Sequence, residues 1–449
     1  MRASARGREG REPLEGGQGG SRCAGAPEPI GEASSMTPWW SLERWLAAPS
    51  FAAPIAWADW TNNIVFVVLF CILVDFVKLL VELLGRSEQR RFASDPTLVT
   101  AIIPCRNGAA VLPGTIEELG RSLPPERILV VDDASEDGTA RVAAALGCTV
   151  LHFEKAKGKA AAVNFAVHRV RTPLTLLLDD DTRIGGARLP TSLLTEEGFD
   201  AVAFHVLPDR RNRGGADGNH LIGHLQRYEY GKSMEIGKRF HDVTQSVSCV
   251  SGAAGLFRTA DLDALHHRHT GAFPGEDLQR TIIHLLDGKR IVFANEPVWT
   301  VAPAGWGAWA RQRLLGWYPG LYHQIANFLR LMFRSGTSWR LRYEMAYNVF
   351  MVVSDPLKTL SMVVIALTPG LRWWAIVIYL TYLSFELYPY WIVRIPGSRR
   401  RAPLAVLLLY PIYGAVNTVL RTASLFTWFW LRYVTGAMRP RRGAKDRIE

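Results

Sequence analysis

Hydrophobic positions along the chain follow two patterns that predict two kinds of structure. From about residue 97 to residue 301, short β-branched and aliphatic runs alternate with helix-like or turn-like stretches, which predicts a mostly parallel sheet with helices between its strands. The predicted strands are Leu98–Ile103, Ile128–Val131, Thr149–Phe153, Leu174–Leu178, Ala201–Leu207 and Ile291–Ala294. Outside this region lie apolar runs long enough to cross a bilayer. The sequence therefore predicts an α/β domain inserted between membrane-spanning helices.

The long apolar runs lie on both sides of the α/β region. Ile64–Leu84 precedes it, and Tyr347–Leu367 and Trp373–Val393 follow it, each about as long as a bilayer core requires. The last apolar stretch, Ala402–Thr435, is interrupted by Arg421. We expect it to form one span plus an interfacial or re-entrant helix.

Charged residues inside these runs are costly in a bilayer and need partners. Asp75 and Lys78 are three residues apart, which predicts a pair on one face of the first helix or contact with a polar cavity. Asp355 and Glu386 fall in the later runs, where they face a polar pathway or have a structural role. Asp355 precedes Pro356, so it is also a candidate cap of a helix break.

Shifts in composition divide the chain into six predicted segments. They are a disordered extension (1–36), an aromatic interfacial segment with the first transmembrane helix (37–92), a cytoplasmic α/β domain (93–302), interfacial helices (303–342), C-terminal transmembrane helices (343–435) and a basic cytoplasmic tail (436–449). Arginines at 86, 90 and 91 directly after the first apolar run place the α/β domain in the cytoplasm. Met36 is an alternative translation start to Met1.

Composition and charge narrow the class of protein. The 449 residues carry 52 Lys+Arg and 41 Asp+Glu, a formal net charge of +11, and 48% of them are hydrophobic. The mean hydropathy of +0.05 fits a soluble domain joined to spans, and excludes collagen-like and disordered chains. Basic residues flank the apolar runs, which favours a bilayer over nucleic acid as the partner. Five scattered cysteines form no zinc or disulfide pattern.

Three consecutive carboxylates, Asp179, Asp180 and Asp181, end the apolar strand Leu174–Leu178. Burying them together is unfavourable unless a cation compensates their charge. Alternation along a strand places Asp179 and Asp181 on the same side. Carboxylates with open positions suit Mg²⁺ or Mn²⁺ bridging to a phosphate. The alternative is a solvated acidic turn.

Two further motifs belong to the same predicted sheet edge, where ligands of open α/β sheets bind. Asp132 and Asp133 end the strand at Ile128–Val131, and their carboxylates can bind a base or ribose, or act as ordinary turn and helix-cap residues. Lys157 and Lys159 flank a glycine at the start of a helix, where backbone N–H groups and ammonium charges face phosphates. A charged helix start is the alternative.

A fourth motif, Phe273–Leu278, enters a helix predicted at Leu278–Leu286 through Pro-Gly and then Glu276-Asp277. Asp277 is a candidate general base for a hydroxyl that attacks a sugar, or a helix cap. The histidines at 266, 267 and 269 lack metal-ligand spacing and predict a surface loop.

In their order and intervals, these motifs resemble those of membrane-embedded family-2 glycosyltransferases with a GT-A domain, such as synthases of cellulose, chitin, hyaluronan and poly-N-acetylglucosamine. The resemblance spans about residues 60–435. It implies a catalytic base at Asp277 and metal ligands at Asp179 and Asp181. The substrate-binding residues that it implies are Pro104, Arg106, Asn107, Asp132, Asp133, Lys159, Asp179, Asp180, Gly252 in the Gly-rich segment Val250–Gly255, Glu276, Gln312, Arg313 and Trp317.

One motif departs from the family pattern. Processive members carry Q-x-x-R-W on an interfacial helix, but here Trp317 comes one residue late after Gln312, and Leu315 or Gly316 stands at the arginine position. Trp317 remains a candidate platform for the acceptor sugar, and Arg311 or Arg313 is the candidate phosphate contact. This irregular motif argues against processive synthesis more than it argues against sugar transfer.

The resemblance implies an inverting, multi-pass transferase of the cell membrane with its catalytic domain in the cytoplasm. It implies a nucleotide-sugar donor, with UDP as the expected carrier, a growing polysaccharide or a glycolipid as acceptor, and Mg²⁺ or Mn²⁺ as cofactor. The later spans would export a polysaccharide. The alternatives are a non-processive transferase that glycosylates a lipid, and a catalytically dead scaffold with the same fold.

Overall fold

The computed structural model describes residues 60–185, 188–209, 220–265, 268, 275–393 and 402–435. All of these belong to the second of two compact units, which begins at Leu46. The predicted extension at 1–36, the histidines at 266, 267 and 269, and the basic tail lie outside the described residues.

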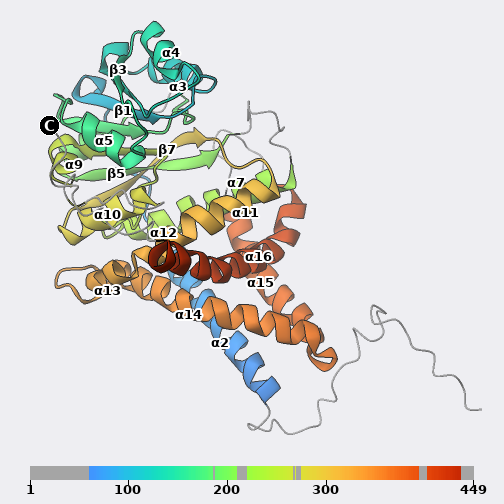
Figure 1. Ribbon diagram of the computed structural model, residues 1–449. Coiled ribbons are helices and arrows are strands. Elements are labelled where there is room, and N and C mark those ends of the chain that lie inside the picture. The colour runs from blue at the N-terminus through green and yellow to red at the C-terminus, as the bar shows by residue number, and fades with distance from the viewer. Residues whose placement is uncertain are drawn as a thin grey trace, which may run out of the picture. The chain divides into compact units, whose positions relative to one another are not determined.

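A seven-stranded sheet in the order β3-β2-β1-β4-β6-β5-β7 is the centre of the α/β domain (Figure 1). The strands are β1 (Val99–Cys105), β2 (Ile128–Asp132), β3 (Thr149–His152), β4 (Leu174–Leu178), β5 (Ala201–Pro208), β6 (Ala254–Arg258) and β7 (Ile291–Thr300). Strand β6 is antiparallel to both of its neighbours, and the remaining pairs are parallel. The six predicted strands and the mostly parallel sheet are confirmed, and β6 adds the antiparallel strand.

Helices pack against the sheet and bury its central strands. All residues of β1, β2, β4 and β5 are buried, which explains why these strands appear in the sequence as unbroken apolar runs. The helices of the domain are α3 (Leu112–Leu119), α4 (Thr139–Ala145), α5 (Lys159–Val167), α6 (Thr191–Thr195), α7 (Leu221–Lys232), α8 (Arg239–Asp242), α9 (Thr259–Leu265) and α10 (Glu276–Leu286). Helix α10 begins two residues before its predicted start.

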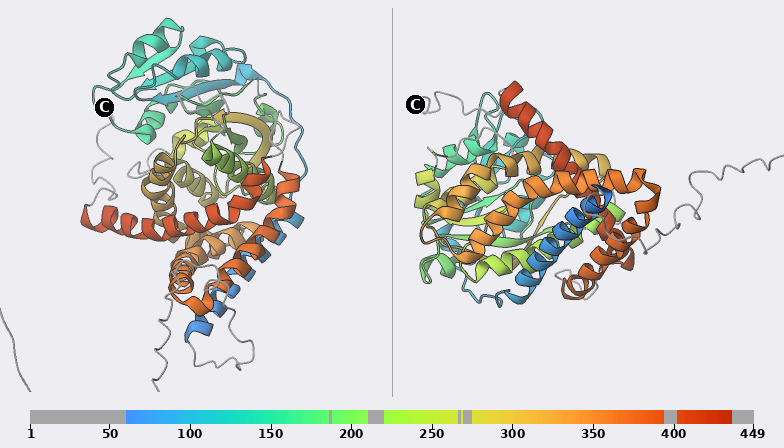
Figure 2. Two further views of the ribbon diagram at one scale, coloured as in Figure 1. Left: turned by 90° about the vertical axis from the view of Figure 1, so that its right-hand side faces the viewer. Right: turned by 90° about the horizontal axis from the view of Figure 1, so that it is seen from below.

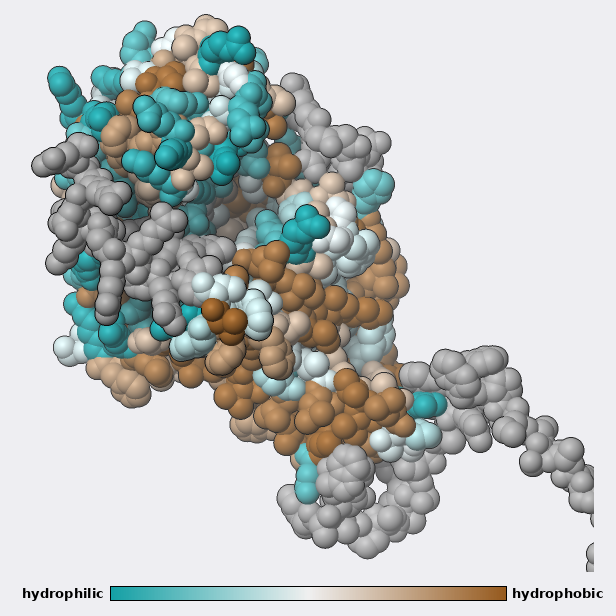
Figure 3. Space-filling model, in the orientation of Figure 1, coloured by the Kyte–Doolittle hydropathy of each residue, from teal (hydrophilic) through white to brown (hydrophobic). Residues whose placement is uncertain are grey.

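The remaining helices lie before and after the α/β domain. They are α2 (Trp60–Leu84), α11 (Trp306–Gln312), α12 (Tyr318–His323), α13 (Ile325–Phe333), α14 (Trp339–Leu367), α15 (Trp373–Ile392) and α16 (Leu404–Phe429). In Figure 2, α2 lies beside α14 although they are far apart in the sequence. Apolar side chains gather over this helical region in Figure 3, whereas the α/β domain is mostly hydrophilic.

Three helices among the described residues are long and apolar enough to cross a membrane: Asn63–Leu84, Trp339–Leu367 and Leu404–Val434. Their length and composition indicate membrane association. Helix α15 covers the apolar run predicted at Trp373–Val393 except for its last residue, but it is not among these three.

The prediction that Arg421 interrupts the last apolar stretch is wrong. Helix α16 passes through Arg421 and continues as a π-helical turn, η6 (Trp430–Val434). Arg421 forms a salt bridge with the buried carboxylate of Asp355 on α14, where Nη2 lies 3.3 Å from Oδ1. Helix α14 also continues through Pro356, so Asp355 does not cap a break. A partner on another helix allows each charge to remain inside a continuous helix.

The Arg421→Leu substitution should destabilise the protein by about 3–5 kcal/mol, because it leaves the Asp355 carboxylate buried without its counter-ion. Thermal or denaturant unfolding in lipid nanodiscs, followed by tryptophan fluorescence, measures this effect. The double variant Asp355→Leu with Arg421→Leu is the matched control, because removing both charges should restore most of the lost stability. Equal losses in the single and double variants would contradict the assignment.

Asp75 and Lys78 do not pair with each other, contrary to the prediction from their spacing. Asp75 accepts hydrogen bonds from Lys358 Nζ at 2.7 Å, Tyr347 Oη at 2.9 Å and Tyr382 Oη at 2.8 Å. These donors come from α14 and α15, so the first helix binds the later helices through one carboxylate.

Lys78 instead forms ion pairs with Glu82 on its own helix and with Glu344 on α14, the latter at 3.2 Å. The buried ring of His241 on α8 lies 3.6 Å from Glu344. Glu82, His241 and Glu344 are close enough together to hold a metal ion, but the Lys78 ammonium already contacts both carboxylates. The cluster therefore joins α2, α8 and α14 by internal charge pairing.

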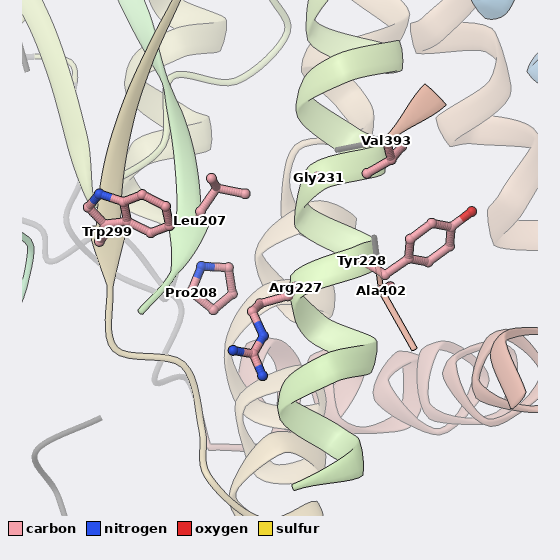
Figure 4. Close-up of a pocket in the computed structure, with 8 residues that line it drawn as sticks. All are labelled: Leu207, Pro208, Arg227, Tyr228, Gly231, Trp299, Val393 and Ala402. Atoms are coloured by element: carbon pink, nitrogen blue, oxygen red, sulfur yellow. The ribbon is translucent and has the colours of Figure 1, made fainter. Parts of the chain in front are cut away.

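Helix α7 connects the sheet to α15. Buried Glu386 on α15 accepts a hydrogen bond from Tyr228 Oη at 2.9 Å. It also forms an ion pair with Lys232 on α7. Figure 4 shows the small cavity beside this contact, with residues of β5 and β7 on one side and α7 on the other. Its free volume of about 10 Å³ is room for one water molecule, so the junction is closely packed.

Candidate active site

The ammonium of Lys159, the first residue of α5, lies where three predicted motifs meet. It forms ion pairs with Asp179 after β4 and with Glu276 at the start of α10, the latter at 3.1 Å. It also donates a hydrogen bond to the carbonyl oxygen of Gly252 at 3.3 Å. Segments that are far apart in the sequence thus converge on one cation at the carboxyl edge of the sheet.

Asp277 lies directly beside this convergence. Gly275 enters α10 with a φ of +92°, a conformation that favours glycine, and allows the turn to place Asp277 in the first helical turn. The Asp277 carboxylate accepts the backbone N–H of Gly252 at 2.9 Å. A Cβ at Gly252 would lie 2.9 Å from the Lys159 ammonium, so a larger residue there would displace the ammonium from its present position.

The three aspartates follow the end of β4 at Leu178 and enter a turn, so the strand alternation predicted to place Asp179 and Asp181 on one side does not extend to them. Their side chains have different partners. Asp180 accepts a hydrogen bond from the thiol of Cys105 at 3.0 Å, which holds its carboxylate against β1. Asp181 accepts a hydrogen bond from Thr300 on β7 at 3.3 Å, and Asp179 faces Lys159. The structure therefore distinguishes Asp180 from the two predicted metal ligands.

Burial gives Asp179 and Asp181 an unusual electrostatic state. Desolvation raises the pKa of Asp179 to about 6, against the opposing charge of Lys159. Desolvation, with the charge of Asp180, also raises the pKa of Asp181 to about 6. The positive charge near these two carboxylates is therefore too small to offset the cost of desolvating their ionised forms. A divalent cation with hard oxygen ligands fits this donor set.

The two aspartates predicted to bind the nucleobase, Asp132 and Asp133, already interact with hydrogen-bonding groups of the protein itself. Asp133 accepts the backbone N–H groups of Lys157 at 2.6 Å and Gly158 at 2.9 Å, and so shapes the loop that leads to Lys159. Asp132 contacts His152 at the end of β3. Both carboxylates are buried, whereas the side chain of His152, which sequence reasoning missed, is exposed at this corner.

The turn after β1 is tied to the turn after β2. Asn107, with a φ of +54°, donates its backbone N–H to Ser135 Oγ and accepts the N–H of Glu136, both at 2.9 Å. Arg106 is exposed beside it, and Pro104 is buried within β1. The predicted nucleotide-side turn is therefore a rigid part of the sheet edge, with Arg106 facing outward.

A π-helical turn accounts for the irregular Gln312–Trp317 spacing. The segment η4 (Arg313–Trp317) is π-helical, with one more residue per turn than an α-helix has. Trp317, five residues after Gln312, is thereby returned to about the face that a residue four positions on would occupy in an α-helix. Arg313 stacks over the Trp317 ring at 3.8 Å and forms an ion pair with Glu229 on α7. Its guanidinium is buried there, so Arg313 supports the tryptophan in this structure.

Tyr230 on α7 is a further site residue that sequence reasoning missed. Its ring lies 5.8 Å from the exposed ring of Trp317. Burial raises the pKa of Tyr230, and the nearby charges of Asp181 and Asp277 add to the increase. Tyr230 is thus close enough to the metal motif and the candidate base for their charges to act on it. No motif in the sequence indicated it, because α7 reaches the site only through tertiary packing.

Comparison with known proteins agrees with this geometry. Residues 100–263 match the sequence model of Glycosyl transferase family 2. The succinoglycan biosynthesis protein ExoU of Rhizobium meliloti is 32% identical over 119 residues, which cover 25% of this chain and 34% of ExoU. Protein RfbJ of Shigella flexneri is 32% identical over 92 residues, 20% of this chain and 70% of RfbJ. Chitin synthase 8 of Mycosarcoma maydis is 27% identical over 48% of this chain and 11% of its own length.

The fold is similar to that of a solved structure. Mannosyltransferase PcManGT from Pyrobaculum calidifontis, in complex with GDP-Man and Mn²⁺, superposes with a TM-score of 0.50 at 16% identity. The similarity covers 82% of this chain and 98% of PcManGT, so it includes helices outside the sheet. The α/β domain is thus of the GT-A type. This chain spans only about a third of ExoU and about a tenth of chitin synthase 8.

Proposed function

Because this chain belongs to glycosyl transferase family 2, we propose that it transfers a sugar from a nucleotide-sugar to an acceptor hydroxyl at a membrane surface. The observation that carries this proposal is the convergence on Lys159, which brings Asp179, Glu276 and Gly252 to one point beside Asp277. A diphosphate, a metal ion and a base are needed together in such a transfer. The GDP-Man and Mn²⁺ in the structure of PcManGT support the donor class and the ion.

Asp179 and Asp181 would hold Mg²⁺ or Mn²⁺, which when bound stabilises the charge of the departing diphosphate. The Lys159 ammonium, which pairs with Asp179 in this structure, would move to the phosphates when the donor binds. Backbone groups of the Lys157–Gly158 loop, held by Asp133, keep Lys159 in place. This chain's own residues thus orient the donor before reaction.

Asp277 would accept the proton of the acceptor hydroxyl as its oxygen attacks the anomeric carbon. The carboxylate is held by the N–H of Gly252, so its position is set before the acceptor arrives. A single displacement inverts the anomeric centre and gives a β-linked product from an α-linked donor. Trp317 and Tyr230 form an aromatic wall on which the acceptor sugar stacks.

The acceptor that we propose is a growing polysaccharide, with export through the membrane helices. The similarity to ExoU and chitin synthase 8 supports polymer synthesis. The arginines after α2 support a cytoplasmic catalytic domain in a multi-pass chain.

A second candidate acceptor is a lipid that receives a single sugar. This is favoured by the internal pairing of the charges of the helical region, Asp75 with Lys358 and Asp355 with Arg421, which leaves these groups bound to one another rather than to a passing chain. It is also favoured by the sequence directly before Trp317, where Gly316 stands in place of the arginine of processive members. Product length separates the candidates: a ladder of sizes supports a polymer, and one lipid-linked sugar supports the second.

The direct test is donor turnover by the full chain in lipid nanodiscs. A panel of nucleotide-sugars is supplied with and without Mn²⁺, and release of nucleoside diphosphate is measured. We expect metal-dependent release with at least one donor when membrane lipids and oligosaccharide primers are present. If no donor gives release under any of these conditions, the enzyme proposal fails and a scaffold of the same fold is favoured.

A further inference from the structure

The carboxyl edge of the sheet carries a second arrangement beyond the metal motif. The strand register places Cys105, Asp132 and His152 opposite one another on β1, β2 and β3. Asp132 is 2% exposed, whereas the side chain of His152 is 54% exposed. A buried carboxylate thus lies directly behind a solvent-facing imidazole at the outer corner of this edge.

Hydrogen bonding determines which nitrogen of this ring faces outward as an acceptor. Asp132 Oδ1 accepts the backbone N–H of Ser135 at 3.1 Å, and Oδ2 lies 2.9 Å from His152 Nδ1. A carboxylate only accepts hydrogen bonds, so Nδ1 carries the proton, and in the neutral ring the lone pair lies on Nε2. The exposed corner therefore presents a hydrogen-bond acceptor held in position by a buried partner.

The corner lies where the base of a bound nucleotide would extend. In the sheet order, β3 lies three strands from β4, about 14 Å. A nucleoside whose diphosphate lies at Asp179, Asp181 and Lys159, and which extends across β1 and β2, would therefore bring its base to the end of β3. Asp133 follows Asp132 directly and binds the loop that leads to Lys159. The end of β2 therefore contacts both the loop at the diphosphate and the histidine at the proposed base position.

We propose that His152 selects the nucleobase of the donor by accepting a hydrogen bond at Nε2 from a ring N–H. This inference rests on the proposed function and makes it more specific. Uracil and guanine carry a ring N–H on their pairing edge, whereas cytosine and adenine carry a ring acceptor there that would face the His152 lone pair. The site then favours uridine or guanosine diphosphate-sugars over the cytidine and adenosine classes.

The test compares binding of UDP and CDP, which differ only at the pyrimidine edge, and of GDP and ADP, by calorimetry with the full chain in nanodiscs and Mn²⁺. We expect the wild-type protein to prefer UDP over CDP, or GDP over ADP, by about tenfold, and His152→Ala to reduce this preference to about twofold. The conservative variant His152→Gln should keep most of it, because its amide oxygen can accept at the position of Nε2. Asp261→Asn on α9, whose carboxylate pairs with Lys289 away from this corner, should keep it fully.

Equal affinity of the wild-type protein within both pairs, or an unchanged preference in His152→Ala, would overturn the inference while leaving sugar transfer intact. In steady-state kinetics the same substitution should raise KM for the donor with kcat nearly unchanged, as expected for a contact equally strong in the ground and transition states. If no nucleoside diphosphate binds and no donor is consumed, the proposed function itself fails and the inference falls with it.

Discussion

Replacing Asp277 by asparagine should lower kcat by roughly 10²–10⁴-fold while leaving donor affinity unchanged, because the amide cannot accept the proton of the attacking hydroxyl. The substitution preserves the size of the side chain, and the amide oxygen can still accept the N–H of Gly252. The start of α10 should therefore keep its structure. Turnover is measured by release of nucleoside diphosphate, and donor affinity by calorimetry.

Asp261→Asn is the matched control for a purely structural effect. Asp261 also lies in the first turn of a helix, α9, but it pairs with Lys289 away from the Lys159 convergence. If Asp277 served only as a helix cap, both substitutions would lower the unfolding temperature slightly and leave kcat nearly unchanged. Normal turnover by Asp277→Asn would remove Asp277 from the chemistry.

Removal of divalent metal should abolish turnover, and Asp181→Asn should lower kcat/KM by roughly 10³-fold even with Mn²⁺ restored, because stabilisation of the leaving diphosphate amounts to several kcal/mol. The physical basis is the pair of partly buried carboxylates, Asp179 and Asp181, whose charges Lys159 compensates only in part. The measurement is turnover after chelation and after stepwise return of Mn²⁺ or Mg²⁺. The wild-type protein should recover, and the variant should need far more metal.

Asp180→Asn is the informative comparison, since it makes the same change one residue away. The Asp180 carboxylate contacts the thiol of Cys105, so its replacement should affect packing more than metal affinity. The metal concentration for half-maximal activity should shift much less than in Asp181→Asn. Equal shifts in the two variants would show that the aspartates bind the ion without the distinction that the structure draws.

Local sequence was sufficient where one segment determines its own surroundings. The bounds of β4 are those predicted, because a run of five apolar residues buried on both faces has few alternatives to a central strand. The acidic residues after β2 and β4 could be placed at one edge, because parallel strands end on the same side of a sheet. The start of α10 was indicated by Pro-Gly followed by two acidic residues.

Pairwise contacts between distant segments could not be predicted in this way. The spacing of Asp75 and Lys78 predicts a pair on one helix face or contact with a polar cavity, whereas the ammonium partner of Asp75 is Lys358, 283 residues later. Arg421 appeared to interrupt a span because Asp355, its partner on α14, could not be identified from spacing. Intrahelical periodicity describes which residues share a face, but not which face of another helix packs against it.

The residues of this protein by themselves determined a mostly parallel α/β domain between apolar helices and a set of acidic turns suited to a metal-bound diphosphate. Tertiary structure decided which side chains complete the site: Tyr230 beside Trp317, and His152 in front of Asp132. The reason is physical. Burial and alternation are local properties of a segment, whereas the orientation of a side chain toward a partner depends on how separate elements pack.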